Sequence, residues 1–247
     1  MIRVGVLTPH VATGPEAEFP AMAPGQVVTC VSRVPVDPAT GADSTTASGL
    51  RVLIAAPVFA EAAAMLAQGS LDVIACASTT SAYAIGPDAE SALVSKLAEE
   101  SGAPAVGTCA SAVLALRALG ADRVALVHPP WTDPELNELG VAYFRRQGFD
   151  VFSSAAADLS RDPDRIDAAA IYDWTSRHVS GGADAVFIGG NGFRAAGAVE
   201  ALEASLDCPV LTSNQVLLWN ALAHTGATAE VRGYGRIFAR TARPLTR

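Results

Sequence analysis

The sequence predicts an α/β protein made of two pseudo-symmetric lobes, each built on an open parallel β-sheet, with a site between the lobes. Two observations predict this fold class. Short runs of valine, isoleucine and alanine alternate with segments of helical length rich in alanine, leucine and glutamate. This alternation is typical of βαβ units whose strands are buried on both faces. The second half of the chain also repeats the first half.

Three pairs of similar segments occur in the same order in the two halves. RVGVLTP at 3–9 pairs with RVALVHP at 123–129, DVIACAS at 72–78 with DAVFIGG at 184–190, and PAVGTCASAVLALRALG at 104–120 with PVLTSNQVLLWNALAHTG at 209–226. One match could arise by chance because β-strands resemble one another. Three matches in the same order indicate a duplicated half.

The individual elements follow from the alternation of strand-like and helix-like segments. Strands are predicted at 2–7, 27–33, 52–56, 72–77, 104–107, 123–128, 149–153, 184–189 and 209–211. Helices are predicted at 58–68, 88–101, 109–119, 134–147, 164–180, 194–205 and 213–224. Pro87-Asp88 and Asp133-Pro134 supply residues that suit a helix start. The predicted first lobe comprises 1–115 with 227–247, and the predicted second lobe comprises 116–226.

Composition and charge argue against several classes of function. Half of the 247 residues (50%) are hydrophobic and 17% are charged, as in a compact globular protein. The net charge of −8 argues against a nucleic-acid partner and against binding to an anionic membrane surface. The start, MIRVGVLTPH, lacks the basic flank and long apolar core of a signal peptide, and no later apolar stretch is long enough to span a bilayer. A cytoplasmic protein is therefore expected.

The cysteines give no sign of a metal site or a disulfide framework. Cys30, Cys76, Cys109 and Cys208 are scattered without CxxC spacing. They are expected to be reduced and mostly buried thiols.

Small polar residues follow two apolar strands, one in each half. Ser78-Thr79-Thr80 follows the strand of the first half and is called the first tip. Gly190-Asn191-Gly192 follows the equivalent strand of the second half and is called the second tip. Ligands of open parallel sheets bind beyond the carboxyl ends of the strands, so these two tips are expected to face one cleft. Hydroxyls, glycine amides and the starts of following helices suit a carboxylate. Either tip by itself could be a helix cap or a turn, but one in each half favours an anion site.

Several stretches resemble the aspartate/glutamate racemase superfamily, in particular its branch of maleate cis–trans isomerases and arylmalonate decarboxylases. They are RVGVLTPH with GPEAEFP, DVIACASTTSAYAIG, AVLALRALGADRVALVHPP, PVLTSNQVLLWNALAHTG and GYGRIFAR, and they span nearly the whole chain. The resemblance implies a racemase-like two-lobed fold, a small carboxylate as substrate, and no metal or organic cofactor. Relatives often form dimers or larger assemblies, so the resemblance is compatible with a homo-oligomer.

The resemblance also implies roles for the two tips. Members typically place a cysteine at each tip, and the decarboxylases keep only the second one. In this chain the first cysteine position falls on Ser78, the hydroxyl pair of the decarboxylases on Thr79 and Thr80, and the second cysteine position on Gly190. The chain therefore departs from the family at both thiols, which disfavours two-base racemisation and thiolate addition to an alkene.

Decarboxylation requires fewer reactive side chains than racemisation or thiolate addition. It needs an apolar pocket, hydrogen-bond donors for an enediolate and a proton source. The candidate proton sources are Cys76, His10, His128 and Tyr83, and His128, which directly follows a strand, is preferred. Pro130 or Trp131 fills the slot of a carboxylate-binding tyrosine in relatives. A tryptophan wall favours an apolar or aromatic substrate.

These considerations define a predicted site and three hypotheses for function. The predicted catalytic residues are Ser78, His128 and Cys76. The residues predicted to bind substrate are Thr79, Thr80, Tyr83, His10, Trp131, Gly190, Asn191 and Gly192. The first hypothesis is a cofactor-independent enzyme of the isomerase family, with altered chemistry on a small mono- or dicarboxylate. The alternatives are an arylmalonate-type decarboxylase with a hydroxyl-lined carboxylate pocket and a non-catalytic carboxylate-binding relative.

Overall fold

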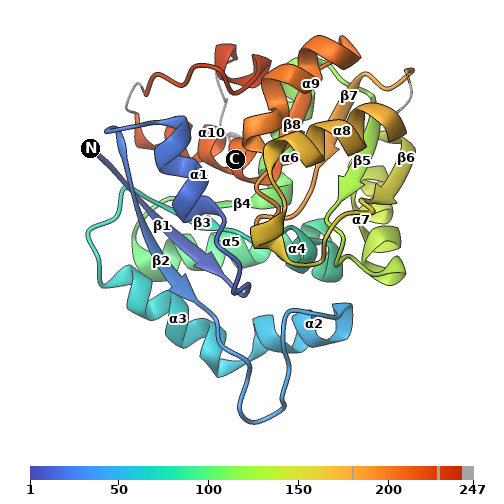
Figure 1. The fold of residues 1–247 in the computed structure, drawn as a ribbon. Helices are drawn as coiled ribbons and strands as arrows, with labels where there is room; N and C mark the ends of the chain where they lie inside the picture. The colour runs from blue at the N-terminus through green and yellow to red at the C-terminus, as the bar shows by residue number, and fades with distance from the viewer. Residues whose placement is uncertain (180, 227–228, 241–247) are drawn as a thin grey trace.

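The computed structural model describes residues 1–179, 181–226 and 229–240, which form two four-stranded parallel sheets (Figure 1). The first sheet has the strand order β2-β1-β3-β4 and the second has the order β6-β5-β7-β8. The strands are β1 Ile2–Thr8, β2 Val27–Arg33, β3 Val73–Cys76, β4 Ala105–Gly107, β5 Arg123–His128, β6 Asp150–Ala156, β7 Ala185–Ile188 and β8 Val210–Thr212. Each strand of the second sheet takes the place of its equivalent in the first. The predicted α/β class and the internal repeat are therefore confirmed.

Helices connect the strands and bury both faces of each sheet. The helices of the first half are α1 Pro15–Met22, α2 Ala47–Ala55, α3 Pro57–Ala67, α4 Thr79–Ile85, α5 Pro87–Ser101 and α6 Thr108–Leu119. Those of the second half are α7 Pro134–Arg146, α8 Ala168–His178, α9 Val199–Leu206 and α10 Ser213–Thr225, with 3₁₀ turns at Pro163–Arg165, Ala196–Ala198 and Arg236–Ala239. Within β3, Val73 and Ala75 pack with α1 and α10, whereas Ile74 packs with α3 and α5. This alternation explains why the strand is apolar throughout.

Two helices are exchanged between the sheets. The helix α6 follows β4 of the first sheet, yet its Leu116 lies in a core with β5 and β7 of the second sheet. Conversely, α10 follows β8 of the second sheet, and its Leu217 lies in a core with β1 and β3 of the first. The predicted lobe boundary at 115 and 116 falls within α6. Of the segment 227–247 predicted for the first lobe, residues 227, 228 and 241–247 lie outside the described residues.

The predicted strand at 52–56 is wrong, because residues Ala47–Ala55 form the helix α2. This helix begins after Thr46, whose side chain accepts a hydrogen bond from Gly49 N, and ends before α3 begins at Pro57. Its buried residues are Ala47, Leu50 and Leu53, which recur at a helical and not at an alternating period. The sequence prediction also missed α1 and α4, which are 8 and 7 residues long.

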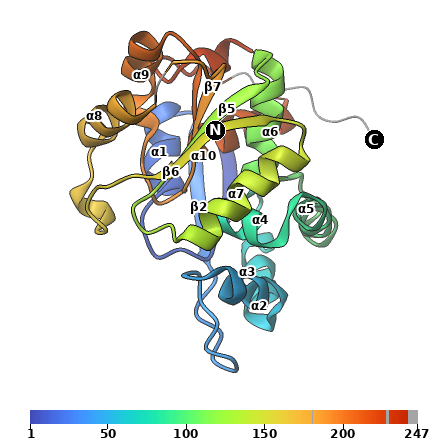
Figure 2. The ribbon, with the colours of Figure 1, turned by 90° about the vertical axis from the view of Figure 1, so that its right-hand side faces the viewer.

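The helices α2 and α3 lie at one end of the molecule, away from α8 and α9 (Figure 2). Their inner sides are buried, with Leu50 0%, Phe59 5% and Leu66 7% exposed. Among the described residues, no single helix is long and apolar enough to cross a membrane. By length and composition alone, only α2 and α3 taken together, bent by 59° at their junction, meet that requirement.

Candidate functional site

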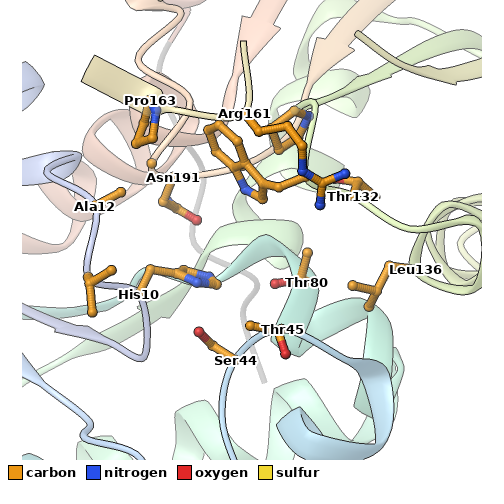
Figure 3. A pocket seen from close by; sticks show the side chains of 15 residues that line it. His10, Ala12, Ser44, Thr45, Thr80, Thr132, Leu136, Arg161, Pro163 and Asn191 are labelled. Atoms are coloured by element: carbon orange, nitrogen blue, oxygen red, sulfur yellow. The ribbon is translucent and has the colours of Figure 1, made fainter. Parts of the chain in front are cut away.

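A cavity of about 280 Å³ lies at the carboxyl ends of the strands and is lined by residues of both halves (Figure 3). The polar lining residues with side chains are His10, Ser44, Thr45, Thr80, Trp131, Thr132, Arg161 and Asn191. The remaining lining residues are glycine or apolar, among them Leu136 and Pro163. The described lining therefore contains one arginine, one histidine and no carboxylate, which suits an anionic ligand.

The structure brings some of the predicted site residues to this cavity and places others behind its wall. The predicted residues that line it are His10, Thr80, Trp131, Gly190, Asn191 and Gly192. Those that do not line it are Ser78, Thr79, Tyr83, His128 and Cys76, each buried. Both tips thus contribute to one cavity, the first only through Thr80 and the second through all three of its predicted residues.

Ser78 holds the imidazole of His10. It is the N-cap of α4, where its Oγ accepts from Ser81 N at 3.2 Å and donates to Ser81 Oγ at 2.6 Å. His10 Nε2 lies 3.1 Å from the same Oγ. Because the only hydroxyl proton of Ser78 goes to Ser81, Nε2 is the donor, and the neutral ring carries its lone pair on Nδ1. Burial lowers the pKa of His10 to about 4, so the imidazole is neutral at pH 7.

Thr80 presents a hydroxyl that has no hydrogen-bond partner in the described part of the protein. The residue is 9% exposed, and its Oγ1 is shielded from solvent. Figure 3 shows its side chain between His10 and Leu136, with the oxygen on the side of His10. An unpaired buried hydroxyl costs about 1–3 kcal/mol. A carboxylate bound in the cavity would supply the missing acceptor.

Thr79 forms its hydrogen bonds within the protein. Its Oγ1 lies 2.8 Å from Ser213 Oγ and 3.2 Å from Asn191 Oδ1, and it accepts from Gly190 N at 3.1 Å. Thr79 N also donates to Asn191 Oδ1 at 3.1 Å. These bonds connect the first tip to the second, so the hydroxyl of Thr79 stabilises the junction of the two halves.

Asn191 continues this network to a buried carboxylate in α1. Its Nδ2 donates to Asn214 Oδ1 at 2.9 Å, and Asn214 Nδ2 donates to Asn191 O at 2.8 Å and to Glu18 Oε2 at 2.6 Å. Glu18 Oε1 accepts from Ala196 N at 2.8 Å. The loop before α1 approaches so closely that a Cβ on Gly14 would lie 2.2 Å from Asn191 O. The network therefore spans residues of both halves.

Glu18 is expected to make the free energy of unfolding depend on pH near neutrality. Burial raises its pKa from 4.5 to about 7, so between these values the folded protein keeps a proton that the unfolded chain has lost. The contribution of Glu18 to the free energy of unfolding therefore falls as pH rises from about 4.5 to about 7, by about 3 kcal/mol at most.

Urea unfolding of the wild type and of Glu18→Gln between about pH 5 and pH 8 measures this contribution. The difference in unfolding free energy between the two proteins should change with pH below about 7 and level off above it. The lowered pKa values of His10 and His128 act in the opposite sense but are common to both proteins, so they cancel. A pH-independent difference would contradict the assignment.

His128, the preferred proton source in the sequence, lies behind the second tip. It is 1% exposed, and burial lowers its pKa to about 4. Its Nε2 lies 3.1 Å from Ser154 Oγ, and the ring packs edge-on against Tyr83 with centroids 5.6 Å apart. A Cβ on Gly189 would lie 3.2 Å from His128 Nδ1 and 3.4 Å from the Tyr83 hydroxyl. Both rings thus occupy the side of Gly189 toward which a side chain would point.

The two other positions considered for thiol chemistry, Gly190 and Cys76, do not present a thiol to the cavity. Gly190 has a φ of +92°, which favours glycine, and a Cβ there would lie 2.7 Å from Pro129 Cγ. This backbone does not accommodate a side chain at residue 190 unless Pro129 moves. Cys76 packs in a core with Leu7 and Ile74, and burial raises its pKa to about 12. Its thiol is therefore protonated and lies outside the cavity lining.

The sequence did not single out several polar residues of the cavity. They are Ser44, Thr45, Thr132 and Arg161. Most lie in connecting segments, between β2 and α2 or between β6 and α8, where the internal repeat gives no guidance. For Arg161, the sequence signal that could have drawn attention to it was the charge cluster RDPDR at 161–165. In the part of the chain that the structure describes, no three His, Cys, Asp or Glu side chains are grouped to hold a metal ion.

Comparison with known proteins relates the chain to decarboxylases and isomerases. The family model described as arylmalonate decarboxylase matches residues 46–238. Unliganded arylmalonate decarboxylase is similar in structure over 97% of this chain and 99% of its own, with a TM-score of 0.80 and 21% identity. The maleate isomerase Iso from Pseudomonas putida S16 is similar over 96% and 98%, with a TM-score of 0.84 and 22% identity.

A third similar structure is the Nocardia farcinica maleate cis-trans isomerase bound to TRIS. The similarity covers 96% of this chain and 98% of the isomerase, with a TM-score of 0.80 and 25% identity. No curated protein matches the chain. The matched relatives are enzymes, as expected from the sequence, and the resemblance to this branch of the superfamily is confirmed.

Proposed function

Because the chain belongs to the arylmalonate decarboxylase family, we propose that it is a cofactor-independent enzyme that decarboxylates a malonate-type acid in the cavity. One observation carries this proposal: His10, held by Ser78, lines the same cavity as the unpartnered hydroxyl of Thr80. A donor for an anion and a group that can transfer a proton are thus present together. These are the parts that the reaction needs from side chains.

The first step breaks a carbon–carbon bond. One carboxylate of the substrate accepts a hydrogen bond from Thr80, and the bond from the central carbon to the other carboxylate breaks. Carbon dioxide leaves, and the electron pair remains as an enediolate on the retained carboxylate. The Thr80 hydroxyl stabilises the charge that develops there, and the apolar walls at Trp131 and Leu136 lower the solvation of the leaving carboxylate.

The second step returns a proton to the central carbon. A dianion beside the imidazole favours its charged form, so substrate binding raises the pKa of His10 above its value of about 4, and Nδ1 takes a proton from solvent. Nδ1 then donates this proton to the carbon, and the neutral tautomer held by Ser78 returns. In this mechanism Ser78 positions the ring, and neither tip needs a thiol.

Turnover in deuterium oxide, followed by NMR, tests the proposal. The substrates are phenylmalonate and alkylmalonates, with maleate, aspartate and glutamate for comparison. A malonate is expected to yield the monoacid with one deuteron on the α-carbon. Thr80→Val keeps the shape of the side chain and removes only the hydroxyl, so kcat/KM should fall by about 10²-fold.

Other outcomes would contradict the proposal in distinct ways. Conversion of maleate or of an amino acid without turnover of any malonate would indicate an isomerase or a racemase. A malonate that raises the melting temperature but is not consumed would indicate a carboxylate-binding protein. Equal rates for the wild type and Thr80→Val would exclude the assigned role of Thr80.

A further inference from the structure

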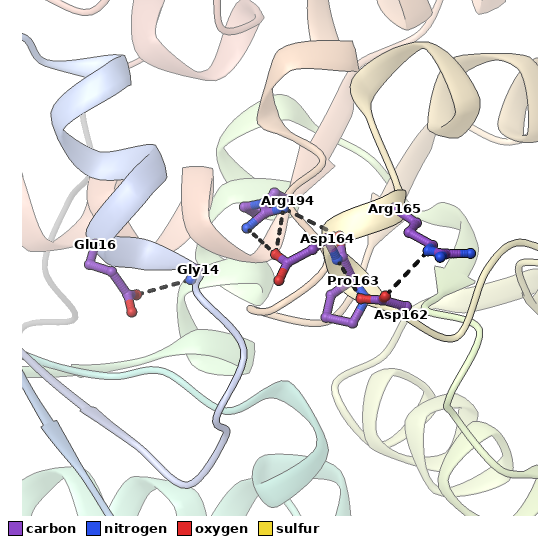
Figure 4. A network of polar contacts seen from close by, with 7 residues as sticks. All are labelled: Gly14, Glu16, Asp162, Pro163, Asp164, Arg165 and Arg194. Atoms are coloured by element: carbon purple, nitrogen blue, oxygen red, sulfur yellow. Dashed lines mark hydrogen bonds and ion pairs between the residues drawn. The ribbon is translucent and has the colours of Figure 1, made fainter.

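Arg161 is the unneutralised cation of the cavity. Its side chain makes no hydrogen bond or ion pair within the described residues, although the acids Asp162 and Asp164 lie in the same segment. Arg165 Nε lies 3.6 Å from Asp162, and Arg194 lies 3.3 Å from Asp164 (Figure 4). Both neighbouring carboxylates thus have other arginines as partners, and the positive charge of Arg161 is left for the cavity.

The third carboxylate drawn in Figure 4, that of Glu16, also has partners of its own. Glu16, in the first turn of α1, accepts from Gly14 N at 2.9 Å and pairs with Arg33. The described cavity lining itself has no carboxylate. Arg161 is therefore a site for an anion that the protein does not provide, in a chain whose net charge is −8.

A second donor lies beside this arginine. Thr132 lines the cavity, and its Oγ1 is shielded from solvent and has no partner among the described residues. Figure 3 shows the Arg161 guanidinium pointing toward Thr132, across the cavity from Ser44 and Thr45. A guanidinium and a hydroxyl together form the donor set for a carboxylate or a similar oxyanion.

The wall near this donor pair is apolar. Trp131, which packs edge-on against Phe193 with centroids 6.0 Å apart, lines the cavity together with Pro129, Leu136 and Pro163. A ligand that uses both donor pairs, Thr80 with His10 and Arg161 with Thr132, thus places an apolar link between its anionic groups against this wall. A plain aryl or alkyl substituent would leave the Thr132 hydroxyl without an acceptor and Arg161 paired only with water.

We infer that the substituent of the substrate ends in an additional anionic group, which Arg161 and Thr132 bind while the malonate group lies at Thr80 and His10. This inference rests on the proposed function and specifies the substrate class as a malonate with an anionic side chain. The second anion does not react, so it contributes binding energy and specificity. Since Arg161 is exposed, water and salt weaken the interaction, and a preference of about five- to ten-fold is expected.

A matched pair of ligands tests the inference. (2-Carboxyethyl)malonate and (3-methylbutyl)malonate have substituents of the same shape and the same number of non-hydrogen atoms, and only the first ends in an anion. The wild type is expected to bind and turn over the anionic compound about five- to ten-fold better, and added salt should reduce this preference. Arg161→Gln should remove the preference, and Arg161→Lys should retain part of it because the charge remains. Arg145→Gln removes an exposed charge from the last turn of α7, outside the cavity lining, and should leave the preference unchanged.

The outcomes separate this inference from the proposed decarboxylation. If both malonates are decarboxylated equally well, or if Arg161→Gln lowers kcat/KM equally for both, the inference is wrong and the proposed function stands. If neither malonate is decarboxylated, the shift in melting temperature that each ligand causes still tests the anion site at Arg161. A stronger shift with the anionic compound that is lost in Arg161→Gln supports the anion site, and equal shifts overturn it.

Discussion

Replacing His10 with glutamine is expected to lower kcat for malonate decarboxylation by about 10²- to 10⁴-fold. The glutamine amide can still donate to Ser78 Oγ, which His10 Nε2 contacts at 3.1 Å, but it cannot exchange a proton near neutral pH. Substrate binding relies on Thr80, so the rise in melting temperature caused by a malonate should persist. Steady-state kinetics combined with thermal shift therefore separates loss of proton transfer from loss of binding.

The pH dependence of kcat gives the same hypothesis an independent readout. The acid form of His10 is the donor, and its pKa is about 4 in the free protein and higher beside a bound dianion. For the wild type, kcat should therefore fall as pH rises through the pKa of His10 in the substrate complex. The residual kcat of His10→Gln should not follow this titration.

Ser78→Ala is the matched variant for the positioning role of the serine. It removes the oxygen that accepts from His10 Nε2, so the ring and its tautomer are no longer held, while Nδ1 can still carry a proton. An intermediate loss of about ten-fold in kcat, with the pH dependence of the wild type preserved, is expected. If Ser78→Ala is as inactive as His10→Gln and loses that pH dependence, Ser78 takes part in proton transfer itself.

The sequence was sufficient for the fold because periodicity and repetition are properties of the backbone pattern. DVIACAS and DAVFIGG predict two equivalent strands, and β3 and β7 occupy equivalent places in the two sheets. The failure at 52–56 has a local cause. VLIAA has the composition of a buried strand, and the Thr46 cap and the period of the buried residues, which make it a helix, are weaker signals than its hydrophobicity.

The site was less predictable because side-chain direction depends on contacts between distant segments. Thr79 and Thr80 are neighbours with the same residue type, yet one is bound to Asn191 and Ser213 and the other is left unpaired at the cavity. His10 was one of four candidate proton sources in the sequence, and only its place at the cavity and its contact with Ser78, 68 residues away, favour it over His128. Arg161 lies in a segment outside the repeat, so no internal comparison could identify it.

Replacing Asn191 with alanine is expected to destabilise the protein by about 2–5 kcal/mol, because it leaves buried polar groups without partners. Thr79 N loses its acceptor at 3.1 Å, and Asn214 Oδ1 loses its donor at 2.9 Å. Asn191 is 2% exposed, so these groups are buried, and a replacing water would have to be immobilised at the wall of the cavity. Urea unfolding at pH 7 measures the loss.

Thr80→Val is the control for this prediction, because its buried hydroxyl has no partner to lose among the described residues. Removing that hydroxyl should leave the free energy of unfolding unchanged or slightly increased, although the same variant is expected to lose catalytic activity. The two polar positions of the tips then show opposite behaviour. Asn191 would be required for stability, and the hydroxyl of Thr80, whose burial is unfavourable in the empty protein, would be required for activity. An Asn191→Ala protein within about 1 kcal/mol of the wild type would show that the network between the tips contributes little to folding.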